Sequence, residues 1–222
     1  MKYISILLLF LASLNSFGFS NQLVLRGGIL AAKTTMGTSL ESNDDFGGYG
    51  LSSSFGYKLE NLEFLLSSNA YVGKVENIRF EVHKNMIQGT GKIRTVDFTP
   101  TLKYTLDFNI YKNWALFGSI GPSWVLHSIN LDNFTSNNTS FSNTKLSYDA
   151  RGIVASIGVE EQVEEKELRP VFIQLLFSYY KSRKVSLVDI SNSKEIQILS
   201  EEESRQGIKT ITWMVNMGLV IF

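Results

Sequence analysis

The sequence predicts an all-β fold in which eight antiparallel, up-and-down strands form a single closed barrel. Three observations predict it: apolar and polar side chains alternate over long segments, connectors alternate between short and long, and the large apolar residues of each segment share one face. The 222-residue chain has 21 basic and 21 acidic side chains and no cysteine. Zero net charge gives no reason to expect nucleic acid or an anionic surface as the main partner, and the lack of cysteine excludes disulfides, thiolate catalysis and cysteine-bound metals.

Residues 1–20, MKYISILLLFLASLNSFGFS, are predicted to form a secretory signal peptide. Lys2 precedes an apolar run from Ile4 to Leu14, and Gly18 and Ser20 are small residues of the kind found at cleavage sites. A run of about eleven apolar residues is too short for a helical anchor, which needs about twenty. We therefore expect a signal peptide over residues 1–20 and one barrel domain over residues 21–222, in an extracytoplasmic compartment.

The segment RTVDFTPTLKYTLDF, residues 94–108, shows the alternation most clearly. Every even-numbered residue from Val96 to Phe108 is apolar, and every odd-numbered residue from Thr95 to Asp107 is polar or charged. Successive side chains leave a strand on opposite faces, so a period of two predicts an extended strand with one apolar and one polar face.

Eight segments of this kind follow one another along the chain. Ser, Thr, Gly, Tyr and Phe are frequent in them, and the spacing of an amphipathic helix is missing almost everywhere. A strand that crosses a membrane at a tilt needs only about nine to eleven residues. The predicted strands are residues 22–32, 46–57, 62–73, 92–108, 114–129, 146–162, 169–183 and 207–222.

The connectors between these segments alternate in length. Three are short, residues 58–61, 109–113 and 163–168, and four are long, residues 33–45, 74–91, 130–145 and 184–206. This alternation places all tight turns at one end of the sheet and all extended loops at the other, as in outer-membrane barrels. A soluble Greek-key sandwich has no reason to sort its loops in this way. A ten-stranded barrel is the alternative if the second or fourth long connector forms a further membrane-crossing hairpin.

Side-chain size indicates which face of each strand points inward. An eight-stranded barrel has an interior only just wide enough for side chains, so the face rich in Ser, Thr and Gly is expected to line the lumen and the large apolar face to meet lipid. The inferred lumen charges, which include both signs and can pair, are Arg26, Glu63, Asp97, Lys103, Asp107 and Glu160. The inferred lipid-facing residues are Phe98, Leu102, Tyr104, Leu116, Trp124, Leu175 and Phe177. Aromatic residues near strand ends, among them Tyr148, Tyr180 and Trp213, are expected in interfacial girdles.

The chain ends in the strand TWMVNMGLVIF. Here it resembles the small eight-stranded bacterial outer-membrane barrels, the group that includes the OmpA transmembrane domain and the OmpX-like proteins. Members typically end in a strand with a terminal Phe, an apolar residue two before it and often a Gly two before that, which the barrel-assembly machinery recognises. Phe222, Val220 and Gly218 stand at these positions. The resemblance therefore implies an assembly signal at these residues, a transmembrane barrel and a location in the outer membrane.

The final strand departs from the family pattern in one respect. Its bulkier residues have the parity opposite to Phe222, and Asn216 would face lipid if the usual orientation held. Either a bulge near Gly218 shifts the register, or both faces of this strand are apolar. The bulkier set is Trp213, Val215, Met217, Leu219 and Ile221.

Few residues are candidates for chemistry. His127 and Ser128 are adjacent and so leave a strand on opposite faces, whereas the His and Ser of outer-membrane lipid A deacylases lie two apart. His127 is expected to face inward, and His83 to be a solvated loop residue. The three glutamates at 201–203 could bind a divalent cation but are interpreted as a solvated face. We expect no catalytic residue, no cofactor and no metal site.

The sequence therefore predicts a non-enzymatic integral outer-membrane protein, a scaffold that presents external loops for envelope integrity, adhesion or recognition. The alternatives are a narrow channel or carrier of small hydrophobic molecules, a lipid-modifying barrel enzyme, and a soluble periplasmic β-sandwich that binds a ligand. The expected partners are outer-membrane lipids and lipopolysaccharide, with the barrel-assembly machinery during biogenesis and no nucleic acid. The sequence identifies no partner for the external loops.

Overall fold

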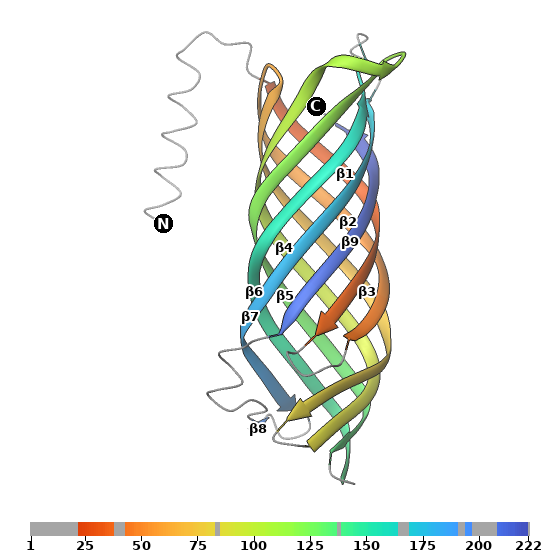
Figure 1. Ribbon diagram of the computed structural model, residues 1–222, viewed down its shortest axis with the longest axis vertical. Coiled ribbons are helices and arrows are strands. Elements are labelled where there is room, and N and C mark those ends of the chain that lie inside the picture. Colours follow the sequence, from red (N-terminus) through yellow and green to blue (C-terminus); the bar gives the residue numbers. More distant parts are fainter. Residues whose placement is uncertain are drawn as a thin grey trace, which may run out of the picture.

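Antiparallel strands wind into one tall barrel (Figure 1). The computed structural model describes residues 22–37, 43–82, 85–136, 139–163, 169–190, 194–196 and 208–221. None of these residues belongs to a helix long and apolar enough to cross a membrane. The strands are β1 (Gln22–Gly37), β2 (Asn43–Leu59), β3 (Leu62–Val82), β4 (Asn85–Tyr111), β5 (Trp114–Ser136), β6 (Thr139–Glu161), β7 (Val171–Asp189), β8 (Lys194–Ile196) and β9 (Lys209–Val220).

Eight of these strands close into a ring. Each strand from β1 to β6 pairs antiparallel with the strand that follows it in the chain. The ring then closes because β7 pairs with β9 and β9 pairs with β1. The predicted fold is confirmed: the chain is a closed, eight-stranded, up-and-down antiparallel barrel of the transmembrane type. The short strand β8 pairs only with β7 and stays outside the ring, so the ten-stranded alternative is wrong.

Tight turns join the strands at the end of the barrel where β9 finishes, which is called the turn end below. Glu60 and Asn61 connect β2 to β3, and Lys112 and Asn113 connect β4 to β5. Glu60 and Lys112 adopt left-handed φ angles of 52° and 46°, as two-residue turns between twisted strands require. Two predicted short connectors are therefore confirmed, and residues 164–168 of the third lie outside the described residues.

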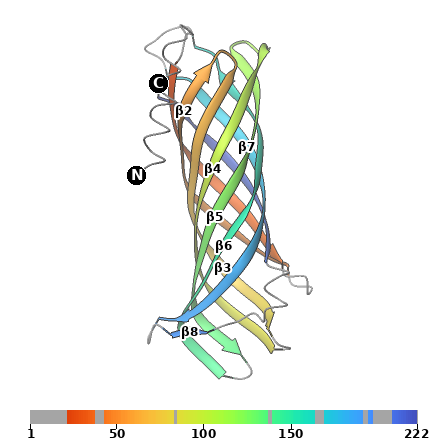
Figure 2. The same ribbon diagram turned by 90° about the vertical axis from the view of Figure 1, so that its left-hand side faces the viewer.

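At the opposite end, called the loop end below, the strands continue far into the long connectors. Strand β3 reaches Val82 and β4 begins at Asn85, while β5 reaches Ser136 and β6 begins at Thr139. Figure 2 shows these two hairpins extending beyond the rest of the barrel. The prediction of extended loops over residues 74–91 and 130–145 is therefore wrong. A hairpin ladder pairs the backbone N–H and C=O groups of a polar segment whatever its side-chain pattern.

The two faces of each strand differ as the alternation requires. In β4 the side chains of Thr95, Asp97 and Lys103 are at most 2% exposed, whereas those of Val96 and Phe98 are 50% and 47% exposed. The same alternation of inward and outward side chains is present in the other barrel strands. Large apolar residues therefore cover the outside of the barrel, and polar residues point inside, where apolar side chains such as Phe117 and Leu176 are also buried.

Towards the loop end the two faces exchange character. In β5, Leu126 points outward and is 56% exposed, but beyond it the exposed outward residues are Asn130 and Asp132, while Ile129 and Leu131 are buried inside. The expectation of a lumen lined by small polar residues is therefore wrong at this end. Tyr148 and Tyr180, expected in an interfacial girdle, also point inward and are each 2% exposed.

The orientation of the last strand follows from its register with β1. The pairing runs without a shift from Arg26 opposite Val220 to Gly37 opposite Lys209, so no bulge interrupts it. Asn216 is 5% exposed and points inward, where its Oδ1 accepts a hydrogen bond from Ser52 Oγ at 2.7 Å. The bulkier residues Trp213, Val215, Met217 and Leu219 point outward and are 46–53% exposed. The outer face of this strand is thus continuous with that of its neighbours.

Two glycines show how closely the strands approach one another. A Cβ atom at Gly152 in β6 would lie 1.8 Å from the carbonyl oxygen of Tyr179 in β7. A Cβ atom at Gly218 would lie 2.1 Å from the carbonyl oxygen of Gly27, at the seam where β9 closes on β1. Only glycine fits at these positions without separating the two strands.

We predict that Gly152→Ala lowers the free energy of unfolding by about 1–3 kcal/mol, because β6 and β7 must move apart to admit the methyl group. Urea unfolding of the detergent-refolded barrel, followed by tryptophan fluorescence, measures the change. The control is Gly118→Ala, where the nearest atom to the new Cβ is 3.7 Å away and the expected change is within about 0.5 kcal/mol. Equal stability of the two variants would contradict the prediction.

Candidate functional site

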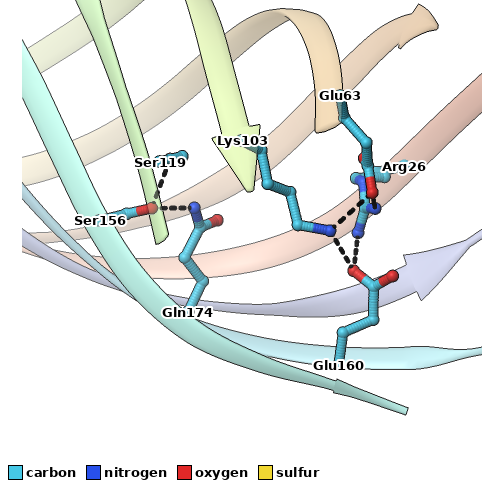
Figure 3. A network of polar contacts seen from close by, with 7 residues as sticks. All are labelled: Arg26, Glu63, Lys103, Ser119, Ser156, Glu160 and Gln174. Atoms are coloured by element: carbon cyan, nitrogen blue, oxygen red, sulfur yellow. Dashed lines mark hydrogen bonds and ion pairs between the residues drawn. The ribbon is translucent and has the colours of Figure 1, made fainter. Parts of the chain in front are cut away.

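Four charged side chains from four strands meet inside the barrel near its turn end (Figure 3). Arg26 of β1 donates to both carboxylate oxygens of Glu63 of β3, from Nη2 at 2.7 and 3.0 Å. Lys103 of β4 donates from Nζ to Glu63 Oε1 at 2.9 Å and to Glu160 Oε2 of β6 at 2.6 Å. Arg26 Nη1 also donates to Glu160 Oε2, which closes the ring of contacts. These four residues are called the ion quartet below.

The ion quartet is neutral as a unit and almost fully buried. Its two cations and two carboxylates have side chains at most 7% exposed. Burial of each ion costs several kcal/mol, which is repaid only where geometry and hydrogen bonding are good on all sides. The ring of Phe117 lies 4.4 Å from Lys103 Nζ and adds a cation–π contact. The quartet thus blocks the lumen at this level with paired charges.

On the loop-end side of the ion quartet, the lumen contains polar side chains and a small cavity. Ser119 and Ser156 share a hydrogen bond of 2.5 Å, and Gln174 Nε2 donates to Ser156 Oγ at 2.6 Å. The cavity beside these residues has a volume of about 40 Å³. Since one water needs about 10–15 Å³ of such space, the cavity has room for only a few water molecules.

Asp97 of β4 forms a separate polar contact in the same part of the lumen. Its Oδ1 accepts hydrogen bonds from the backbone N–H of Asn69 at 3.0 Å and from Asn69 Nδ2 at 3.1 Å, and its Oδ2 accepts from Nδ2 at 3.1 Å. The carboxylate is 2% exposed. No cation is needed to hold it, because one asparagine supplies both backbone and side-chain donors.

His127 of β5 lies deeper towards the loop end and is fully buried. Its Nδ1 shares a hydrogen bond of 2.8 Å with Thr95 Oγ1, and its ring lies 4.7 Å from that of Tyr148. Its Nε2 has no hydrogen-bond partner among the residues that the structure describes. Beyond it an apolar layer fills the barrel, formed by Met36, Phe46, Ile93, Ile129, Leu131, Leu146 and Ile208.

The lumen charges predicted from sequence fall into three groups. Arg26, Glu63, Lys103 and Glu160 meet in the ion quartet, and Asp97 is buried apart from them. The side chain of Asp107 lies outside the described part of the chain, as do Phe222, His83 and residues 201–203. The interior partners Asn69 and Gln174 were not among the predicted site residues, although the same alternation places them on the inward faces of β3 and β7. The inward position of Asn216 depends on the register of the last strand with β1.

The predicted lipid-facing residues lie on the outer wall. Phe98, Leu102, Tyr104, Trp124 and Leu175 are 41–47% exposed. Leu116 and Phe177 are half-buried on the same face. Neighbouring rings pack along this wall: the centroids of Phe177 and Trp213 are 4.7 Å apart, and those of Phe98 and Trp124 are 6.4 Å apart. The wall is therefore an apolar surface with no protein layer over it among the described residues.

Several solved structures have a similar overall shape. Neisserial surface protein A is 13% identical over 88% of this chain and 96% of its own, with a TM-score of 0.45. The outer membrane protein OprG from Pseudomonas aeruginosa is 13% identical over 90% and 94%, with a TM-score of 0.48. The attachment invasion locus protein Ail of Yersinia pestis is 14% identical over 89% and 98%, with a TM-score of 0.44. No protein-family model and no curated protein matches the chain.

We predict that Glu63→Gln lowers the free energy of unfolding by about 3–5 kcal/mol, because Arg26 and Lys103 then share one carboxylate in a buried site. Adding Lys103→Met should recover a large part of the loss, since Arg26 and Glu160 remain as a balanced pair. The control is Glu60→Gln in an exposed turn, with an expected change within about 0.5 kcal/mol. Denaturant unfolding in detergent measures all three, and a double variant no more stable than Glu63→Gln would contradict the charge-balance account.

Proposed function

We propose that this chain is an integral outer-membrane protein without enzymatic activity, a scaffold that presents hairpins and loops on the outside of the cell for envelope integrity, adhesion or recognition. One observation carries the proposal: every strand of the ring contributes a large apolar side chain to a continuous outer belt. Eight such residues, each 42–66% exposed, are Ile29, Leu51, Phe64, Phe98, Trp124, Ile153, Leu175 and Val215.

The belt supports a lipid environment because water would disfavour it. Soluble monomers rarely expose an apolar patch larger than a few hundred Å², and this belt encircles the barrel. A hydrocarbon solvent also requires every backbone N–H and C=O group to be paired within the protein, and a closed sheet meets this requirement without an open edge. The soluble sandwich alternative is wrong, because the chain forms one closed sheet and not two packed sheets.

The filled lumen favours a scaffold over a channel. The ion quartet occupies the turn end, and the apolar layer that includes Phe46 and Ile129 occupies the loop end. Between them lies a cavity of only about 40 Å³. A pore that conducts ions or small solutes would need both fillings to move.

The buried position of His127 supports a non-enzymatic role. A catalytic histidine must reach the group whose proton it transfers, and this side chain is 0% exposed with Nδ1 bonded to Thr95. The adjacent Ser128 points to the opposite face of β5. Lipid chemistry at the outer wall would need other residues.

Export and assembly complete the proposal. The signal peptide over residues 1–20 would direct the chain across the inner membrane, and Gly218, Val220 and Phe222 would be read by the barrel-assembly machinery. Gly218 also has a structural role, because any larger side chain would push β9 away from β1 at the closing seam. Lipopolysaccharide and the other outer-membrane lipids would then surround the apolar belt.

The proposed orientation can be tested by labelling, since the chain has no cysteine of its own. We predict that a membrane-impermeant maleimide labels Ser136→Cys, at the tip of the β5–β6 hairpin, in intact cells. Lys112→Cys, in a turn at the other end, should react only after the outer membrane is permeabilised. Gel mobility of boiled and unboiled membrane fractions checks that each variant is folded. Labelling of both variants in intact cells, or recovery of the protein without detergent, would contradict the proposal.

We also predict that the purified barrel gives no sustained conductance in planar lipid bilayers, because side chains fill both ends of the lumen. The control is a known general-diffusion porin reconstituted in the same lipids. Long-lived, voltage-independent openings of this protein would favour the narrow channel instead.

A further inference from the structure

The outer wall carries an apolar groove. It lies over β9, β1, β2, β3 and β4 and has a volume of about 840 Å³, within the range of about 300–1,000 Å³ usual for ligand sites. Its origin is a change of side-chain size, because the outward residues Ala31 and Ala70 are small while their neighbours are large. In the register Leu51 lies opposite Ala70, and Ala31 lies opposite Tyr49.

The large side chains at the rim of the groove project from the outer wall and are strongly exposed. Tyr49, Leu51 and Ile29 are 74%, 66% and 61% exposed, among the highest values for the large apolar residues of the described chain. The floor reaches the sheet itself, since the inward residues Leu30 and Tyr71 also line the groove. The feature is therefore a depression in the apolar belt.

Three cations lie where this groove reaches the loop end of the belt. Arg94 of β4 lines the groove, and Lys92 is two residues along the same outward face. Lys74 of β3 is the direct cross-strand partner of Lys92. All three side chains are exposed, and none has a carboxylate partner in the part of the chain that the structure describes. Lys74, Lys92 and Arg94 are called the groove cations below.

The arrangement of the groove cations is unfavourable without an anion. Like charges directly opposite each other on adjacent strands destabilise a sheet. A phosphate between Lys74 and Lys92 would remove this repulsion, and Arg94 can bind the same phosphate with two parallel hydrogen bonds. An apolar groove that ends in such a cluster matches a molecule with a hydrocarbon chain and a phosphate at one end.

We propose that the groove and its cations bind an anionic lipid, with one acyl chain along the groove and a phosphate of its headgroup at Lys74, Lys92 and Arg94. The proposal rests on the proposed membrane location and adds a specific site to it. Charge complementarity favours this occupant over a second copy of the chain, whose own groove would bring the same cations to the interface. The lipid would belong to the leaflet at the loop end of the barrel.

A second group of cations provides a matched control on the other side of the barrel. Arg151 of β6 lies opposite Lys181 of β7, which lies opposite Lys209 of β9. In the wall beside them the rings of Phe177 and Trp213 are in contact at 4.7 Å. These cations have the same charge and the same opposed arrangement, but the one small outward residue beside them, Ala155, lies opposite the large Phe177.

The test titrates the purified barrel in neutral detergent with diphosphorylated lipid A, with the same lipid after removal of its phosphates, and with inorganic phosphate. Native mass spectrometry counts the bound molecules. The variant Lys92→Ala/Arg94→Ala should weaken binding of the phosphorylated lipid about tenfold or more, as loss of two hydrogen bonds to a charged group implies. Ala70→Trp, which fills the groove, should weaken it similarly while leaving the cations in place. Gel mobility of unboiled samples checks that each barrel is folded.

The controls are Arg151→Ala/Lys181→Ala and Ala155→Trp, an outward alanine on β6 away from the groove. Both should change the affinity less than about threefold, because the acyl-chain contacts of the groove remain. Equal weakening by the two double variants would reduce the effect to general charge attraction and overturn the proposal. Equal binding of the dephosphorylated lipid, binding of inorganic phosphate alone with the same affinity, or a change of oligomeric state in place of lipid loss on Ala70→Trp would also overturn it.

The outcome is separable from that of the proposed function. A barrel that is recovered from the outer membrane but shows no preference between lipids and variants would end the lipid-site proposal alone. A chain that is absent from the membrane fraction would end both.

Discussion

Closure of the sheet between β1 and β9 is the constraint on which the rest of the structure depends. A barrel in hydrocarbon has no water to pair its backbone groups, so each strand must have a partner on both sides. With eight strands in the ring, the lumen is narrow. The side chains inside it must therefore be small, or, where they are large and charged, paired with one another. Gly218 at the seam and the ion quartet inside are two consequences of this one limit, since the first allows close approach and the second fills the lumen with balanced charge.

The barrel has two different sections along its axis. In the section with the apolar belt, polar side chains such as Asp97 point inward and apolar ones such as Phe98 point outward. Nearer the loop end the pattern inverts, with Ile129 inside and Asn130 outside, as in a water-soluble core. The position of this inversion marks the level at which the proposed environment changes from lipid to water. The β3–β4 and β5–β6 hairpins extend beyond it (Figure 2), so the proposed scaffold presents strands as well as loops.

The outer wall is uneven in a way that its hydrophobicity alone does not explain. Between β7 and β9 the rings of Phe177 and Trp213 pack together in the belt, whereas on the side of β1 to β4 Ala31 and Ala70 leave a groove. On both sides of the barrel, cations on neighbouring strands lie directly opposite each other, as Lys74 and Lys92 do on one side and Arg151 and Lys181 on the other. A uniform lipid annulus would require neither the groove nor its alignment with Lys92 and Arg94. This difference between two sides of one barrel is the basis for separating a specific lipid site from general attraction to an anionic surface.

The sequence by itself determined the number of strands, the position of two tight turns and the facing of most side chains, because a period of two fixes which residues share a face. It also determined that residues such as Arg26 and Glu160 point into the lumen. Only the tertiary structure decided that four of the charges form one quartet while Asp97 pairs with Asn69, since these contacts join strands far apart in the chain. The facing of the last strand likewise required its register with β1, and the groove required small residues on neighbouring strands to be placed side by side. Alternation along a strand is a local property, whereas the partner across the ring depends on the shear with which the sheet closes.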